Sequence, residues 1–407
     1  MINVVIFSGG RGAKTLIPAL LNKEGVNLTS VVNAYDDGKS TGEIREFFKM
    51  LGPSDIRKVQ ENMIPENHID YKAIIGLFEY RYPINVTKEE VWEDFFSFVH
   101  NQKESLSGFY FQDEKIKASL KEIIKVLLKG LSIIEKAENK QLNYGDCSIM
   151  NLIYAGAYLY FKGNFEDTTI FIDKLFSLRG TVLPTNIEDK KLLAIREDGT
   201  ILFNEAEIVE LRANTRIKKI YLLDQYPDRA LLSNMSIDEV EDYFEIMNRQ
   251  VAITSRVERS IKDADIIIYV PGTQHSSLYP SYMSKGLTEA IVNNRRAVKI
   301  FITNIGEDYE TPSYTASDFI NGAIRYLKMG AEFKVDVNDI FTHALVNNKF
   351  SGNLENYVKY DLTDLETIGC NIILDEFENP DSFGKHDGIK LAKTIMNLYL
   401  KKFELKL

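Results

Sequence analysis

The sequence lacks the features that mark secreted, zinc-binding and membrane-spanning proteins. It has only two cysteines, Cys147 and Cys370, which lie far apart and show no metal-ligand spacing. Two reduced thiols of this kind are typical of a cytosolic protein. No apolar run approaches the roughly 18–20 residues that cross a bilayer, and the first residues do not indicate a signal peptide. We therefore expect a cytoplasmic protein with no membrane partner.

Positive charge is also in short supply. The 49 lysines and arginines are outnumbered by 59 aspartates and glutamates, which gives a formal net charge of −10. A nucleic-acid partner would require a basic face, so none is expected, although a local basic pocket for a small anion is compatible with this balance. Hydrophobic residues make up 44% of the chain, as in ordinary globular proteins, and nothing excludes a homo-oligomer.

The order of the predicted elements favours an α/β fold. A β-branched run at 2–7, a glycine turn, a helix at 13–21 and a second strand at 30–34 open a Rossmann-like, doubly wound, mostly parallel sheet. Further buried strands are expected at 265–270, 298–303 and 371–374, with a helix near 385–401 at the C-terminus. In such sheets ligands bind beyond the carboxyl ends of the strands.

We expect one domain over residues 1–407 that carries two additions. A helical insertion is predicted for about 60–140, where 88–99 and 118–137 show apolar residues at helical spacing. A small β-rich excursion is predicted for about 180–212, because Asp198-Gly199 stands between two apolar runs as in a hairpin.

The strongest chemical signal is the acid loop at 34–42. Asp36 and Asp37 follow the second strand and are followed by glycines, hydroxyls and Lys39. A pair of acids in a turn is commonly a solvated surface feature, but carboxylates beside glycine-flanked amides also suit Mg²⁺ and phosphate oxygens. A Walker A loop is excluded because Asn33 stands where its first glycine is required.

Two glycine loops complete the predicted nucleotide site. Gly9-Gly10-Arg11-Gly12 lacks the third glycine of the dinucleotide fingerprint, where Thr15 stands, but it still suits a phosphate at a helix N-terminus. Residues 271–277 form a second predicted anion cradle, in which His275 either donates to a phosphate or sits exposed. Asp55, in a third loop, is either a helix N-cap or a metal ligand.

Seven short motifs recur in the same order in a known family. They are Ser8-Gly9-Gly10-Arg11-Gly12, Asp36-Asp37-Gly38-Lys39-Ser40-Thr41-Gly42, Ser54-Asp55-Ile56-Arg57, Val182-Leu183-Pro184, Asp198-Gly199, Pro271-Gly272-Thr273 through Pro280, and Asn304 with Glu310-Thr311. On this ordered set the chain resembles the CofD-like family, which includes 2-phospho-L-lactate transferase (CofD) and the YvcK gluconeogenesis factors. The acid loop and residues 183–208 resemble the YvcK branch more closely.

The resemblance implies a Rossmann-like domain that binds a nucleoside diphosphate conjugate or a nucleotide-sugar together with Mg²⁺. Carried over by motif, Asp37 and Asp55 are the expected metal ligands, and Asp36 and Asp37 are the expected catalytic carboxylates. The expected nucleotide-binding residues are Gly9, Gly10, Arg11, Gly12, Lys14, Lys39, Ser40, Thr41, Arg57, Asn151, Gly272, Thr273, Ser276, Ser277 and Asn304.

Several positions depart from the pattern of the family. Lys39 stands where many relatives have glycine, Arg11 where threonine is common, and Lys58 where asparagine usually follows the arginine. Gln274-His275 replaces the usual Leu-Tyr. Two functions stay open: a transferase that passes a phospho-linked group to an acceptor hydroxyl and releases a nucleoside monophosphate, and a nucleotide-sugar-binding regulator without turnover. A nicotinamide oxidoreductase is disfavoured by the missing glycine.

Overall fold

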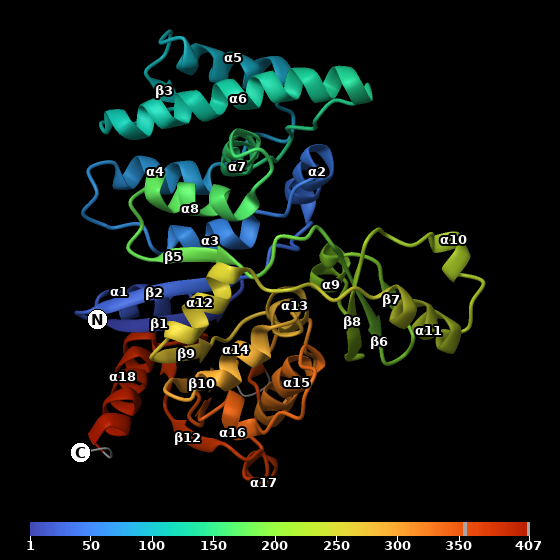
Figure 1. The fold of residues 1–407 in the computed structure, drawn as a ribbon. Coiled ribbons are helices and arrows are strands. Elements are labelled where there is room, and N and C mark those ends of the chain that lie inside the picture. Colours follow the sequence, from blue (N-terminus) through green and yellow to red (C-terminus); the bar gives the residue numbers. More distant parts are fainter. Residues whose placement is uncertain (353–355, 405–407) are drawn as a thin grey trace.

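The centre of the computed structural model, which describes residues 1–352 and 356–404, is a sheet of seven strands (Figure 1). The strand order is β12-β11-β10-β9-β1-β2-β5, and every neighbouring pair is parallel. The strands are β1 (Ile2–Ser8), β2 (Val26–Val32), β5 (Thr181–Pro184), β9 (Ile266–Tyr269), β10 (Val298–Ile302), β11 (His343–Asn347) and β12 (Asn371–Asp375). The predicted Rossmann-like α/β class is confirmed.

The direction of the winding changes at β1. The chain moves outward from β1 through β2 to β5, then returns to the other side of β1 and moves outward again from β9 to β12. Apolar, mostly β-branched strands that are buried throughout, such as β9, suit this central position between helices. Loops at the carboxyl ends of β1, β2 and β9 therefore meet at the switch point, where sheets of this kind bind ligands.

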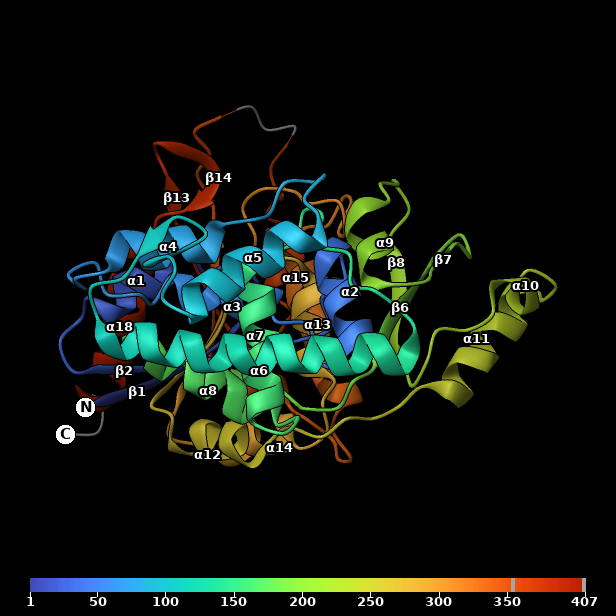
Figure 2. The ribbon, with the colours of Figure 1, turned by 90° about the horizontal axis from the view of Figure 1, so that it is seen from above.

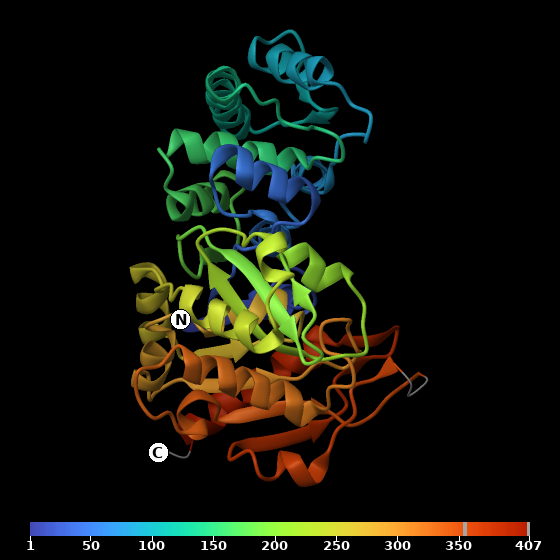
Figure 3. The same cartoon turned by 90° about the vertical axis from the view of Figure 1, so that its right-hand side faces the viewer.

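Helices extend beyond the β5 edge in stacked layers (Figures 1 and 3). Beside this part of the sheet lie α1 (Leu16–Leu21), α2 (Lys39–Phe48), α3 (Ser54–Glu61), α4 (Tyr71–Glu79), α7 (Ile149–Tyr160) and α8 (Phe165–Leu175). The outermost layer is α5 (Lys88–Val99) and α6 (Glu114–Glu138), with a hairpin of β3 (Ser105–Leu106) and β4 (Phe109–Tyr110) that the sequence did not predict. The start of α1 is three residues later than predicted because 9–15 form turns.

A second sheet lies beside the carboxyl ends of the strands and projects from the body (Figure 2). It consists of β6 (Lys191–Arg196), β7 (Ile201–Leu202) and β8 (Ile217–Leu223), accompanied by α9 (Glu205–Glu210), α10 (Arg229–Leu232) and α11 (Ile237–Met247). The Asp198-Gly199 hairpin is confirmed, since β6 and β7 pair antiparallel. The β-rich excursion differs from the predicted 180–212: β5 pairs with β2 in the main sheet, and β8 lies beyond residue 212.

The remaining elements cover the β9–β12 half. They are α12 (Ser255–Asp263), the π-helical turn η1 (Gln274–Leu278), α13 (Tyr279–Tyr282), α14 (Leu287–Asn293), α15 (Ala316–Met329), α16 (Val337–Ile340), α17 (Leu362–Leu365), β13 (Glu378–Asn379), β14 (Ser382–His386) and α18 (Gly388–Glu404). Helix α15 begins with a capping box between Thr315 and Asp318. Within the described residues, no helix has the length and apolar character needed to cross a membrane.

Candidate functional site

The acid loop after β2 is held in place by a buried arginine. Arg45, only 1% exposed, donates to the backbone oxygens of Tyr35 (2.7 Å) and Asp36 (3.3 Å) and forms an ion pair with Asp189 (2.7 Å). Asp36 Oδ1 accepts the amide of Gly38 at 3.0 Å, the local bond by which an aspartate closes a turn. The backbone that carries Asp36 is therefore held by Arg45.

Asp55 is not the cap of its helix. The N-cap position of α3 is Pro53, which makes no capping bond, so the N-cap alternative for Asp55 is wrong. Its carboxylate instead accepts from Lys58 Nζ at 3.0 Å and from the hydroxyl of Ser277 at 2.9 Å. Lys58 also lies 4.0 Å from Asp36 Oδ2, so it bridges two of the three acids of the predicted site.

A fourth carboxylate, Glu205 of α9, completes the cluster. Glu205 is 8% exposed, and its Oε2 lies 3.4 Å from the amide of Asp37. Burial raises the pKa of Glu205 well above its ordinary value, and Asp36, Asp55 and Asp37 add to the shift by repulsion. Tyr226, on the same excursion, donates its hydroxyl to the carboxylate of Asp37.

The cluster holds more negative charge than its neighbours compensate. Burial raises the pKa of Asp36, with repulsion from Asp55 as the next cause and Lys58 opposing it. Burial also raises the pKa of Asp37, against the attraction of Arg45. Asp55 in turn raises the pKa of Lys58. An added cation would relieve the repulsion between these carboxylates.

The donor set fits a divalent cation that brings further ligands with it. Asp37 Oδ1 is buried and has no hydrogen-bond partner within the described chain, and carboxylate oxygens are ligands that Mg²⁺ prefers. Across residues 1–352 and 356–404, no three His, Cys, Asp or Glu side chains gather closely enough to hold a metal by themselves. Diphosphate oxygens and water would therefore have to supply the remaining ligands, as is usual for Mg²⁺.

The first glycine loop lies directly against this cluster. A Cβ added at Gly10, where φ is +23°, would stand 2.7 Å from Asp55 Oδ1, and one added at Gly12 would stand 1.9 Å from the oxygen of Pro271. Within the described chain, the amides of Gly10, Arg11 and Ala13 donate no hydrogen bond. Small residues thus permit close packing and leave backbone donors for an anion.

Three backbone amides of the second glycine loop donate to side chains that lie behind it. The amide of Gly272 donates to Asn304 Oδ1 at 2.9 Å, and the amides of His275 and Ser276 donate to Glu310 at 2.9 and 3.0 Å. The hydroxyl of Ser276 also donates to Glu310, and that of Thr273 to Ser277 at 2.9 Å. These bonds fix the loop as a wall that presents Ser277 to Asp55, while the amides of Thr273, Gln274 and Ser277 donate no hydrogen bond within the described chain.

His275 matches neither alternative taken from the sequence. It is 1% exposed, and its ring lies among Tyr279, Tyr314 and Tyr326. Burial lowers its pKa to about 3, so the ring is neutral near pH 7. The interpretation of His275 as an exposed residue is therefore wrong, and the ring packs into the protein.

Other predicted nucleotide-binding residues lie behind or beside the cluster. Arg57 is buried and donates to the carbonyl oxygen of Phe78, and burial lowers the pKa of Arg57. The amide nitrogen of Asn151 donates to the hydroxyl of Thr41 at 3.3 Å, while its Oδ1 is buried without a partner in the described chain. Ser40 accepts from Arg81 at 3.3 Å.

Three predicted cations are exposed. Burial raises the pKa of Glu61, at the C-terminal end of α3. Lys14 and Arg11 lie near enough to oppose this shift. Lys14 also lines a cavity of about 680 Å³ beside α1, α3 and α4. Lys39 begins α2 with φ +47°, a left-handed backbone conformation in which glycine is favoured over other residues. This conformation would suit the glycine that the family resemblance leads us to expect at this position.

Sequence reasoning missed Arg45, Glu205 and Tyr226. Glu205 and Tyr226 reach Asp37 across 168 and 189 residues, a separation over which no local spacing rule operates. Arg45 stands in a helical stretch that carries other charged residues, so its burial has no sequence signal.

Comparisons with known proteins extend over most of the chain. A family model described as 2-phospho-L-lactate transferase CofD matches residues 4–378. The gluconeogenesis factor of Bacillus subtilis (strain 168) is 24% identical over 397 residues, which are 97% of each chain. The putative gluconeogenesis factor of Thermotoga maritima is 25% identical over 399 residues, covering 97% of this chain and 98% of its own. A crystal structure of a UPF0052-family protein from Bacillus halodurans has a TM-score of 0.65 at 21% identity, over 97% of this chain and 100% of that one, so the fold is shared.

Proposed function

This chain belongs to the CofD family, and from that membership we propose that it binds a nucleoside diphosphate conjugate with Mg²⁺ at the carboxyl edge of β1, β2 and β9. The supporting observation is the cluster of Asp36, Asp37, Asp55 and Glu205. The raised pKa values of Asp36, Asp37 and Glu205, together with the unpartnered Oδ1 of Asp37, favour a bound cation. The free amides of the first glycine loop lie beside it and suit diphosphate oxygens. Asp37 and Asp55 are the proposed metal ligands.

The proposed reaction transfers the phospho-linked group of the conjugate to an acceptor hydroxyl. The hydroxyl oxygen bonds to the phosphorus, the phosphoanhydride bond breaks, and a nucleoside monophosphate leaves. Asp36 takes the proton of the hydroxyl, because a carboxylate whose pKa is raised is a stronger base. The metal would neutralise charge on the diphosphate. Lys58, held by Asp55, shares that charge on the protein side.

A second candidate is a nucleotide-sugar-binding regulator that uses the same pocket without turnover. Its support is the match to proteins named gluconeogenesis factors over 97% or more of both chains. The excursion that carries Glu205 and Tyr226 also has its own apolar cluster, around Leu193, Tyr221 and Phe244. Because this unit has its own core and contacts Asp37, its position could change when a ligand binds at the acid cluster.

Calorimetry with UDP, GDP and UDP-sugars, with and without Mg²⁺, tests the binding that both candidates require. We expect heat that depends on Mg²⁺ for at least one of these ligands; its absence for all of them would remove both candidates. Release of nucleoside monophosphate, measured by chromatography with candidate acceptors, separates the two.

The variant Asp36→Asn sharpens the second measurement. If Asp36 is the base, the variant keeps its affinity and loses roughly 100-fold or more of the transfer rate. A wild-type protein that binds tightly but releases no monophosphate would favour the regulator.

A further inference from the structure

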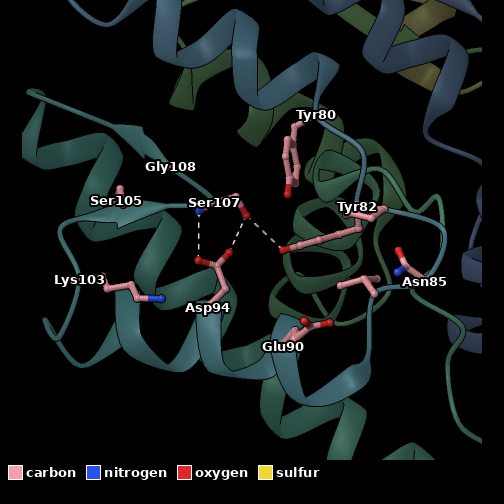
Figure 4. A pocket seen from close by; sticks show the side chains of 11 residues that line it. Tyr80, Tyr82, Asn85, Glu90, Asp94, Lys103, Ser105, Ser107 and Gly108 are labelled. Carbon is pink, nitrogen blue, oxygen red and sulfur yellow. Dashed lines mark hydrogen bonds between the residues drawn. The ribbon is translucent and has the colours of Figure 1, made fainter.

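A cavity of about 660 Å³ lies in the outer helical layer and shares no lining residue with the acid cluster. Figure 4 shows the residues that line it. Its walls are the segment after α4 with Tyr80 and Tyr82, helix α5 with Asp94, and the β3–β4 hairpin with Ser107. Figure 4 shows the hydroxyl of Tyr80 pointing into the space between these walls. The size suits a small molecule, since ligand pockets typically hold roughly 300–1,000 Å³.

The hairpin wall is fixed by a strained serine. Ser107 and Gly108 have φ of +49° and +88°, as in the two-residue turns that join tight hairpins. Serine is unfavourable in this conformation, but the carboxylate of Asp94 accepts both its amide (3.2 Å) and its hydroxyl (2.5 Å). The hydroxyl of Tyr82 lies 3.3 Å from the same serine oxygen. Backbone strain held by surrounding groups in this way is common at ligand clamps.

The cavity also carries polar groups that nothing else in the described chain uses. The hydroxyl of Tyr80 and the side chains of Asn85 and Lys103, of which the last two are exposed, make no hydrogen bond or ion pair within the described chain. Glu90 Oε1 adds a free acceptor, whereas Glu90 Oε2 accepts from Thr87 and both oxygens of Asp94 accept from Ser107. Free donors and a free acceptor are therefore present together, beside the ring of Tyr80, which meets that of Tyr82 edge to face at 5.2 Å.

We propose that this cavity binds a small, uncharged polyhydroxy compound, a sugar or a polyol. Each hydroxyl is both a donor and an acceptor, which matches a wall that offers both. Two carboxylates oppose an anion, and Lys103 opposes a cation. The proposal concerns a site separate from the acid cluster and does not depend on nucleotide binding.

Saturation-transfer NMR on the full chain, with glucose, myo-inositol and glycerol as millimolar probes, tests the proposal. We expect transfer to at least one probe, and a dissociation constant about 5-fold weaker in Tyr80→Phe, because that change removes one hydrogen bond. Lys103→Ala should weaken binding similarly. Tyr110→Phe is the matched control, since Tyr110 is exposed on the same hairpin and does not line the cavity.

Three outcomes would overturn the proposal. They are no transfer to any probe, equal affinity in Tyr80→Phe and Tyr110→Phe, and tighter binding of glucose 6-phosphate or choline than of the neutral probes. Thermal unfolding shows whether each variant is folded, and neither Tyr80 nor Lys103 loses an internal bond when its polar group is removed. Asp37→Asn should leave the NMR signal unchanged, so failure here is distinguishable from failure of the nucleotide site.

Discussion

The two glycine loops beside the acid cluster differ in how far side chains engage their backbone amides. In the first loop, at 9–12, the amides of Gly10 and Arg11 donate to nothing within the described chain. In the second loop, at 271–277, Asn304 and Glu310 take three amides. Similar composition therefore has different consequences, because side-chain acceptors take three amides of the second loop and none of the first. We expect changes in the first loop and the acid cluster beside it to alter the affinity for nucleotide. Changes in the second loop should alter the free energy of unfolding.

The largest expected effect is on stability, from Glu310→Ala. The change leaves two buried amides and one hydroxyl without their acceptor, which should lower the free energy of unfolding by about 3 kcal/mol. Denaturant unfolding measures this loss, with the exposed Glu307→Ala as the control. A gain in affinity for diphosphates in Glu310→Ala would instead show that the freed amides form a phosphate cradle.

The next effect is on affinity, from Asp37→Asn. Removing the charge of an oxygen ligand should weaken Mg²⁺-dependent nucleotide binding on the order of 100-fold, roughly 2.7 kcal/mol. Stability should not fall, because the change also removes repulsion from Asp36. Calorimetry with and without Mg²⁺ measures the loss, and Asp242→Asn on the exposed face of α11 is the control. Unchanged affinity would remove Asp37 from the metal site.

The fold could be predicted from sequence where local patterns decide the structure. The apolar runs of β1, β9 and β10 and the spacing along α5 and α6 located these elements to within a few residues. The four residues of β5 do not show by themselves which sheet they join, so they were assigned to the wrong one. No local pattern distinguishes a strand that pairs with β2 in the main sheet from one that pairs within the second sheet.

The site could be predicted in part, for the same reason. Asp36 and Asp37 could be located because they follow a strand closely, and the carboxyl ends of parallel strands meet at one edge of the sheet. Glu205 could not be located, because it is one of three glutamates in a short helix of the excursion and nothing local distinguishes it from the other two. The state of the second loop was also hidden, since it depends on Glu310 lying behind it.

The pH dependence of stability tests the packing behind the second loop. His275 has a pKa of about 3 when folded and about 6.5 when unfolded, so the unfolded chain binds the proton more readily. Stability should therefore fall as the pH drops below 6.5, by about 2 kcal/mol between pH 7 and pH 5 for this group. Denaturant unfolding should show this part of the slope in wild type and not in His275→Leu. The exposed His100→Leu should keep it.

The smallest expected effect comes from changing Lys39. It tests whether the ammonium group of Lys39 takes part in the nucleotide site beside the first glycine loop. Lys39 and Lys49 lie at the two ends of α2, both exposed and both left-handed, with φ of +47° and +51°. Glycine at either position should raise the free energy of unfolding by about 0.5–1 kcal/mol, since relief of the left-handed backbone exceeds the entropy that glycine adds to the unfolded chain.

The charge of Lys39 contributes to the low pKa of Asp146, whose largest cause is the hydrogen bond from Arg81. We therefore expect Lys39→Gly and Lys49→Gly to bind nucleotide within twofold of wild type. A loss of affinity in Lys39→Gly and Lys39→Ala, but not in Lys49→Gly, would instead give Lys39 a direct role at the phosphates.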